Sequence, residues 1–178
     1  MTMTEPTSNS PAPAGEAAAS EATDASIFDT IDPALKVVSV DAVIAAPASE
    51  IFELIADPVR QLEWDGNDNL GAAAQGQRVT GAGGSFITTL TKGIDRENHV
   101  VDFEEGRLIA WKPSEIGGEP FGHKWTWEIE ATGESSSVVR QTYDWTELRD
   151  PRRLPRAQST TSENLLASMK RLKALAES

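Results

Sequence analysis

The stretch AAPASEIFELIADPVRQLEWDGND, residues 45–68, predicts two short helices followed by a polar turn. Pro47 suits the first position of a helix, and Glu50 lies in the first turn, where an acidic side chain is favoured. Pro58 ends this helix because proline disfavours helical geometry in the residue before it, and a second helical turn follows at 59–64. Four residues give the first helix an apolar face: Ile51, Phe52, Leu54 and Ile55.

Segments typical of β-strands lie on both sides of this helical pair. VVSVDAVIA (37–45) is β-branched and largely alternating, which predicts a first strand. After a loop at 65–76, rich in Gly, Asn and Asp, the pattern predicts strands at 77–91, 98–104, 107–111, 123–131 and 138–145. Glu105-Gly106 suits a hairpin turn, and 112–122 is a loop. These spacings predict an antiparallel meander.

The C-terminus predicts a long amphipathic helix. Thr160-Thr161-Ser162-Glu163 fits a capping box at its start. Apolar residues follow at helical spacing: Leu165, Leu166, Met169, Leu172 and Leu175. A helix over 160–177 would be ~27 Å long at 1.5 Å per residue, enough to cross a whole sheet. The fold class is therefore α+β: one strand, two short helices, a run of strands and a closing helix.

This order and three quoted segments resemble the START-like, or Bet v 1-like (SRPBCC), superfamily. Residues 45–68 resemble the opening of polyketide cyclase/dehydrase-like and lipid-transport-like proteins, and GHKWTWEIE (122–130) and YDWTEL (143–148) look like later strands of the actinobacterial group. The resemblance covers about 36–177. It implies a helix-grip fold, in which a curved antiparallel sheet wraps around the long C-terminal helix. Carriers, cyclases and co-chaperone-like proteins all share this fold, so function must come from the site.

Residues 1–34 differ in composition from the rest of the chain. They hold six acids and no Lys or Arg, and they are rich in Ala, Ser, Thr and Pro. Such a segment buries too little apolar surface to offset its ordering entropy. We predict a disordered acidic tail at 1–34 and a START-like domain at 35–178. A cluster of Ile27, Phe28 and Ile31 could dock as a helical turn, but we favour fraying.

Composition narrows the classes of partner. The net charge of −12 argues against nucleic acid, because phosphate binding needs clustered Lys and Arg. No apolar run approaches the ~20 residues that span a bilayer, and no secretion signal is visible at the N-terminus. The absence of cysteine excludes disulfides and thiolate sites and suits a reducing compartment. We expect a cytoplasmic monomer or homodimer without a cofactor.

Aromatic residues mark a candidate pocket between the sheet and the C-terminal helix. All five tryptophans fall in the strand region or just before it: Trp64, Trp111, Trp125, Trp127 and Trp145. Successive side chains alternate across a strand, so His123, Trp125 and Trp127 share a face. The other predicted ligand-binding residues are Tyr143, Phe86, Leu165 and Met169. The alternative is that these side chains are packed core; a cavity of roughly 300 Å³ or more would favour the pocket.

The candidates for acid–base chemistry are His123, Tyr143 and Asp65. His123 could move a proton and Tyr143 could donate to an enolate-like oxygen, whereas we interpret Asp65 as a structural acceptor of backbone N–H groups. We predict no metal site. The residues from Asp65 lack the Gly and Glu of a calcium loop. We interpret GAGGS (81–85) as a pocket-mouth loop or bulge.

Four arginines surround two prolines before the last helix: Arg149, Arg152, Arg153 and Arg156. They could meet an anionic ligand group, but we favour a solvated loop that balances an acidic surface.

Three functional hypotheses remain open. The first is binding of a hydrophobic small molecule, such as a lipid, an acyl chain or a polyketide. The second is an aromatase/cyclase-type enzyme that positions a poly-β-ketone, which requires His123 and Tyr143 to converge. The third is a protein-interaction module, which requires an exposed apolar patch outside the pocket.

Overall fold

An antiparallel sheet of seven strands forms the body of the computed structural model, which describes residues 27–178. The strand order is β1-β7-β6-β5-β4-β3-β2, so every strand after β2 pairs with the one before it in the chain and β1 closes against β7. The strands are β1 (Val37–Ile44), β2 (Leu70–Ala73), β3 (Ser85–Leu90), β4 (Asp95–Glu104), β5 (Leu108–Ser114), β6 (Lys124–Gly133) and β7 (Ser136–Asp144).

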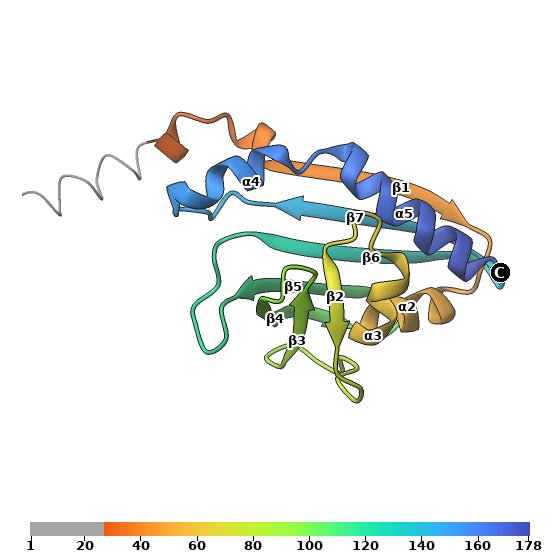
Figure 1. Cartoon of the computed structure of the whole chain (residues 1–178). Coiled ribbons are helices and arrows are strands. Elements are labelled where there is room, and N and C mark those ends of the chain that lie inside the picture. Colours follow the sequence, from red (N-terminus) through yellow and green to blue (C-terminus); the bar gives the residue numbers. More distant parts are fainter. Residues whose placement is uncertain (1–26) are drawn as a thin grey trace, which may run out of the picture.

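Within residues 27–178, helical segments precede β1, connect β1 to β2 and follow the last strand. A 3₁₀ turn η1 (Pro33–Lys36) precedes β1, and α2 (Ala48–Ala56) and α3 (Pro58–Trp64) connect β1 to β2. A second 3₁₀ turn η2 (Pro151–Arg153), the short α4 (Leu154–Ser159) and the long α5 (Ser162–Ala176) follow the last strand. In Figure 1, α5 runs lengthwise beside β1 and β7 and meets the α2–α3 pair. The predicted helix-grip fold is confirmed.

The helical pair forms as the proline positions predict. Asp57 caps α3 because its side chain accepts a hydrogen bond from the Val59 N–H at 3.1 Å, and Pro58 occupies the first turn. The predicted apolar face of α2 is buried. Trp64, at the end of α3, donates its indole N–H to the Leu54 carbonyl at 2.7 Å. This bond ties the two helices together and holds the Trp64 ring against the sheet.

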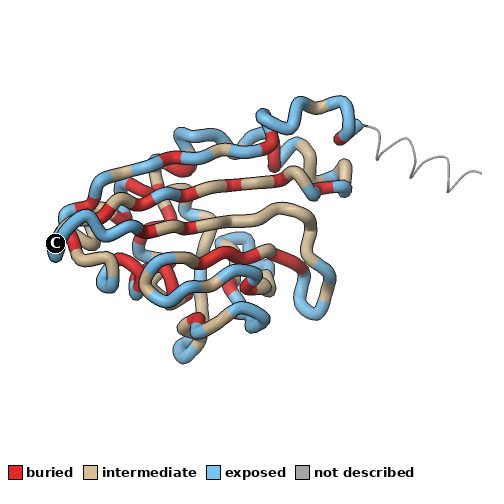
Figure 2. The backbone as a smooth tube through the Cα atoms, turned by 180° about the vertical axis from the view of Figure 1, so that it is seen from behind, coloured by how far each residue is buried: buried red, intermediate tan, exposed pale blue. Residues whose placement is uncertain are grey.

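The strand register places the aromatic residues in rows. Trp111 of β5 pairs with Trp125 of β6, which pairs with Tyr143 of β7. Two residues along, Trp127 pairs with Gln141 and lies on the same face, because side chains alternate across a strand. Figure 2 shows buried positions recurring along these strands between exposed ones. The meander therefore carries an aromatic face toward the helices.

The edge of the sheet differs from the prediction. Residues 70–73, predicted as loop, form β2, whereas 77–84, predicted as strand, form none. The Gln77 side chain explains the second difference. Its amide accepts from the Ile87 N–H at 2.7 Å and donates to the Ile87 carbonyl at 2.9 Å. A side chain thus satisfies the backbone of β3 where a neighbouring strand would otherwise pair.

The last helix begins one residue later than the predicted capping box. Thr161, rather than Thr160, is the N-cap, and Asn164, rather than Glu163, completes the reciprocal pair. The Thr161 N–H donates to the Asn164 side chain at 2.8 Å. The arginine-rich segment before α5 is also not the predicted loop, because it forms η2 and α4 around a buried Ala157.

The cluster before β1 docks rather than frays. Residues 27–29 form a helical turn, and Phe28 is fully buried in the core. The Lys36 ammonium donates to the Phe28 carbonyl at 2.6 Å, and its side chain is itself buried. The preference for fraying was therefore wrong for this cluster. Residues 1–26 of the predicted tail lie outside the described residues, so the tail stays a prediction.

Candidate functional site

A cavity of about 430 Å³ lies between the inner face of the sheet and the helices that cover it. Its walls come from α3 and the turn after it, strands β2 to β7, the short α4 and the first turns of α5. The volume exceeds the roughly 300 Å³ at which ligand pockets begin. The interior is therefore not filled by side chains alone.

One wall of the cavity is aromatic. Trp125 and Tyr143 lie 4.4 Å apart between ring centroids, and Trp64 meets Trp127 edge-to-face at 5.0 Å. All four line the cavity together with Trp111. Trp127 is only 1% exposed, whereas Trp125 is half-buried and open to the cavity. Such a wall offers flat apolar contact area for an aromatic or acyl body.

Seven of the ten predicted ligand-binding residues line the cavity: Trp64, Trp111, His123, Trp125, Trp127, Tyr143 and Leu165. The other three, Phe86, Trp145 and Met169, do not. Phe86 packs edge-on behind Trp111 at 5.4 Å, so it supports the wall from outside. Trp145 and Met169 are buried in the core. The cavity touches α5 only through its first two turns, and Met169 lies beyond them.

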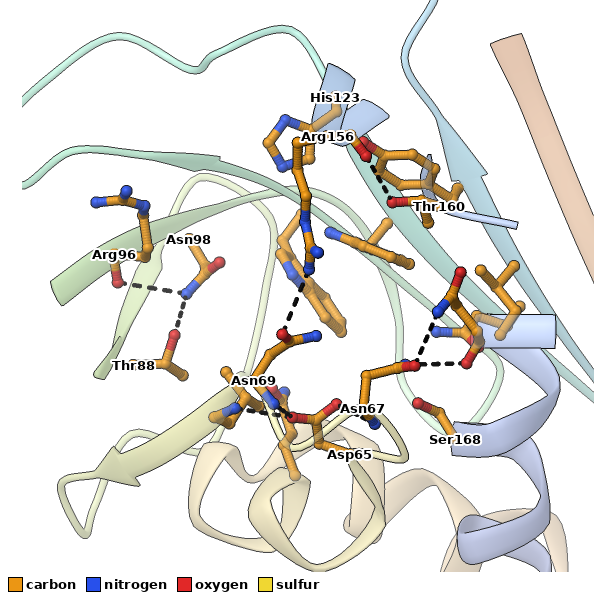
Figure 3. A pocket seen from close by; sticks show the side chains of 18 of the residues that line it. Asp65, Asn67, Asn69, Thr88, Arg96, Asn98, His123, Arg156, Thr160 and Ser168 are labelled. Atoms are coloured by element: carbon orange, nitrogen blue, oxygen red, sulfur yellow. Dashed lines mark hydrogen bonds between the residues drawn. The ribbon is translucent and has the colours of Figure 1, made fainter. Parts of the chain in front are cut away.

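The opposite wall is polar, and the sequence prediction missed most of it. Amide, hydroxyl and guanidinium groups from five segments face the cavity: Gln61 of α3, Asn69 of the following turn, Thr88 of β3, Arg96 and Asn98 of β4, and Asn164 of α5. In Figure 3, Asn69 lies below the space, and Thr88, Arg96 and Asn98 lie to one side of it. The polar turn after the helical pair supplies Asp65, Asn67 and Asn69 of this wall, but the sequence pattern did not show that their side chains would face the cavity.

Asp65 organises the turn after α3. Its carboxylate accepts hydrogen bonds from the Asn69 N–H at 2.6 Å and the Leu70 N–H at 2.8 Å, with a longer one from Asn67 at 3.3 Å. The structural role expected for Asp65 agrees with these bonds. A carboxylate engaged by three backbone N–H groups orients the turn, so the side chains of Asn67 and Asn69 project toward the cavity (Figure 3).

The same turn is fastened to α5. The Gly66 N–H donates to the Ser168 hydroxyl at 3.0 Å. The Asn67 amide donates to the Asn164 carbonyl at 3.0 Å and accepts from the Asn164 amide at 3.1 Å. These bonds join segments about a hundred residues apart in the sequence, and they close the lower end of the cavity.

Three arginines lie at the other end. Arg153 stacks on the Phe121 ring, with the guanidinium carbon 3.2 Å from the ring centroid, and Arg96 lies over the same ring at 5.4 Å. Arg156 reaches from α4 across the opening to the Asn69 side chain, its Nη2 donating at 3.3 Å (Figure 3). The favoured expectation of a solvated loop was wrong about the loop, because Arg153 lies in η2 and Arg156 in α4. Both residues line the cavity, and Arg156 is also exposed to solvent.

His123 and Tyr143 converge beside these arginines. Their ring centroids lie 5.7 Å apart, and both side chains line the cavity. Burial, followed by the positive charges of the nearby arginines, lowers the pKa of His123 to about 4. Burial also raises the pKa of Tyr143 to about 12, although a hydrogen bond with Thr160 opposes this shift. At neutral pH the imidazole is therefore uncharged and the phenol is protonated.

The lowered pKa of His123 predicts a pH-dependent loss of stability. The folded value of about 4 lies below the usual 6.5, so the unfolded chain binds more protons between these two pH values. Stability should therefore hold above pH 6.5 and fall as the pH drops toward 4. We expect wild-type protein to lose roughly 2 kcal/mol more than His123→Gln over this range.

Urea denaturation at a series of pH values measures this difference. His99→Gln is the matched control, because the His99 ring bonds Ser114 outside the cavity lining and its replacement should leave the His123 contribution in place. Identical pH slopes for wild type and His123→Gln would contradict the assigned burial of the neutral imidazole.

Three buried polar atoms lack a hydrogen-bond partner within residues 27–178: Trp127 Nε1, Gln141 Oε1 and Arg153 Nε. All three belong to residues that line the cavity. A buried polar group without a partner costs about 1–3 kcal/mol, so a polar ligand group or a water molecule is expected to complete these three atoms.

The sheet, the closing helix and the cavity between them define a helix-grip protein. Residues 36–177 match the family described as polyketide cyclase / dehydrase and lipid transport. The chain belongs to this family. It is also 31% identical over 104 residues to the uncharacterized protein Rv0088 of Mycobacterium tuberculosis, a match that covers 57% of this chain and 44% of that protein. The matched part thus spans under half of this curated relative's length.

Solved structures share the fold at low sequence identity. Protein Ms6760 of Mycobacterium smegmatis superposes with a TM-score of 0.59 at 12% identity, covering 81% of this chain and 92% of that one. The Aha1 dimer of Colwellia psychrerythraea gives a TM-score of 0.54 at 17% identity, covering 79% and 96%. At these identities the comparison establishes the fold alone.

Within residues 27–178, none of the helices has both the length and the apolar character needed to cross a membrane. The cytoplasmic location and the monomeric or homodimeric state stay predictions.

Proposed function

We propose that the chain binds a small amphipathic molecule with a large apolar part, such as an acyl chain or a polyketide-like ring system, in this cavity. The observation that carries the proposal is the 430 Å³ space walled on one side by Trp64, Trp111, Trp125 and Trp127. Membership of a family described by polyketide chemistry and lipid transport supports the same class of ligand. The unpartnered atoms of Trp127 and Gln141 favour a ligand that also carries a hydroxyl or carbonyl group.

Filling the cavity should weaken ligand binding. Ala157 is buried on α4 and lines the cavity, so Ala157→Phe would place a ring in the ligand's space. We expect its affinity for the neutral fluorescent probe phenylnaphthylamine to fall at least about tenfold. Fluorescence titration measures the affinity, and a thermal melt checks that the variant is folded.

Ala131→Phe is the matched control, since Ala131 is exposed near the end of β6 and outside the cavity. It should bind the probe as wild type does. Equal affinity of wild type and folded Ala157→Phe would show that the probe binds elsewhere, which counts against the cavity as the site.

A cyclase-type enzyme is the second candidate, favoured by the convergence of His123 and Tyr143. The neutral imidazole would remove a proton next to a carbonyl of a bound poly-β-ketone, while the Tyr143 hydroxyl donates a hydrogen bond to the enolate oxygen. The enolate carbon would then attack a second carbonyl carbon of the same molecule. Loss of the resulting hydroxyl, together with one proton, would release water. Positioning supplies most of the rate in such a reaction.

Two variants separate binding from catalysis. His123→Gln and Tyr143→Phe keep the approximate shape of the wall, so both should retain affinity for phenylnaphthylamine. If the chain is a cyclase, each should slow conversion of a poly-β-keto thioester by about a hundredfold or more. Product analysis by mass spectrometry detects the loss of water. If wild-type protein binds the probe but converts no substrate, the chain is a ligand-binding protein and not a cyclase.

A further inference from the structure

The arginines at the cavity differ from the other arginines in their partners. Each of the following six has a carboxylate within hydrogen-bond distance: Arg60, Arg78, Arg107, Arg140, Arg152 and Arg171. Arg149 instead bonds two backbone carbonyls. The three arginines that line the cavity, Arg96, Arg153 and Arg156, have no carboxylate at that distance among residues 27–178.

The partners of the cavity arginines are weak or distant. Arg153 lies 3.9 Å from Glu115 and 3.6 Å from Asp150, both beyond hydrogen-bond distance, and its Nε is buried without a partner. Arg96 donates to the Asp95 backbone carbonyl at 3.0 Å. Among residues 27–178, the hydrogen-bond partner of Arg156 is the neutral Asn69 amide, at 3.3 Å. The chain has a net charge of −12, so carboxylates are plentiful. Three arginines at one opening without a hydrogen-bonded carboxylate therefore require an explanation.

The cavity itself holds little negative charge to balance them. Asp65 is the one carboxylate that lines it within the described residues, and its oxygens are occupied by backbone N–H groups of the turn. His123 lines the same cavity, and burial together with the charges of these three arginines lowers the pKa of its ring. The positive potential is therefore felt inside the cavity and is not confined to the outer surface.

Aromatic contacts position the guanidinium groups of Arg96 and Arg153 before any ligand arrives. Arg153 and Arg96 both lie against Phe121, and His123 stacks on that ring at 6.1 Å with nearly parallel planes. A stacked guanidinium keeps its N–H donors at the ring edge, free to receive an oxyanion in the paired geometry that arginine prefers.

We propose that the ligand is an organic acid whose carboxylate binds Arg96, Arg153 and Arg156 while its apolar body lies against the tryptophan wall. This inference rests on the proposed binding function and adds the chemical class of the ligand. A cavity of 430 Å³ suits one ring system or one short acyl chain rather than a two-chain phospholipid. The ligand is thus a free acid that enters with its anion at the arginine end.

A matched pair of probes tests the role of the charge. Anilinonaphthalene sulfonate and phenylnaphthylamine share one aromatic skeleton and differ by a single anionic group. We expect the anionic probe to bind about tenfold or more tightly at low salt, and the difference to shrink as salt is added. Naphthoate should then displace it with higher affinity than naphthamide, because only the former carries a carboxylate.

Three substitutions locate the interaction: Arg96→Gln, Arg153→Gln and Arg156→Gln. Each should weaken binding of the anionic probe by about tenfold and leave the neutral probe within about twofold. Arg140→Gln is the control, since Arg140 is exposed and paired with Asp41 on β1, away from the cavity. Arg156 is also exposed, so we expect Arg156→Gln to fold normally. This variant therefore still tests the inference if Arg96→Gln or Arg153→Gln fails to fold.

The outcomes separate this inference from the function it rests on. Equal affinity for the two probes would overturn the inference that the ligand is an organic acid, while leaving the cavity as a binding site. An equal loss of anionic-probe affinity in Arg140→Gln would overturn it in the same way. If neither probe binds, and neither naphthoate nor naphthamide binds, both the binding function and the organic-acid inference would be overturned.

Discussion

Replacing Gly66 by alanine should destabilise the protein by about 3 kcal/mol or more, at the upper end of what overpacking costs. A Cβ atom at this position would lie 2.2 Å from the Ala167 carbonyl carbon and 2.3 Å from the Ser168 nitrogen. Both are backbone atoms of α5, so no side chain can rotate away. Relief requires α5 to move from the turn, which breaks the bond between the Gly66 N–H and the Ser168 hydroxyl.

Thermal melts measure the effect as a fall of about 6–12 °C in Tm, at 2–4 °C per kcal/mol for a chain of this size. Gly81→Ala is the matched control, because nothing lies within 4 Å of its Cβ position and its backbone is not left-handed. Its melting temperature should be close to that of wild type. An unchanged Tm for Gly66→Ala would contradict the close contact between the turn and α5.

Trp127→Ala should cost about 3–5 kcal/mol of unfolding free energy, the range for truncating a buried aromatic residue. The ring is 1% exposed and packs edge-to-face on Trp64 at 5.0 Å. Its removal leaves a void between β6 and α3 that backbone pairing in the middle of the sheet prevents from collapsing. Urea denaturation monitored by far-ultraviolet circular dichroism gives the free energy without relying on the lost chromophore.

Trp125→Ala provides the contrast within the same strand. Trp125 is half-buried and faces the cavity, so its truncation should cost less than about half as much stability. It should nevertheless weaken phenylnaphthylamine binding, because the ring supplies contact area to the ligand. Equal stability losses in the two variants would mean that Trp125 is packed in the core and does not form part of the ligand-facing wall.

The sequence predicted the parts of the fold that depend on local patterns. Pro47 and Pro58 delimit α2, the alternation through Trp125, Trp127 and Ile129 marks β6, and Glu105-Gly106 turns the β4–β5 hairpin. Each of these signals acts within a few residues. The aromatic wall followed from the same alternation, because residues two apart on a strand share a face.

The polar wall could not be predicted in this way because it depends on long-range contacts. Asn67 meets Asn164 only after α5 has packed on the turn, and Arg156 reaches Asn69 only because α4 forms. The missing strand pairing at 77–84 has the same origin, since Gln77 bonds Ile87 ten residues away. No local period indicates such side-chain bonds, so the cavity's chemistry emerged only from the three-dimensional arrangement.

Native mass spectrometry of the protein purified from cells, under gentle and then denaturing conditions, tests the central claim most directly. The cavity, its tryptophan wall and the three arginines at its opening predict a gentle-condition mass that exceeds the denatured mass by one small organic acid, or a saturable adduct after incubation with anilinonaphthalene sulfonate. Equal masses in both states and no adduct at saturating probe would contradict the account, because they would show that the cavity takes no ligand of this class.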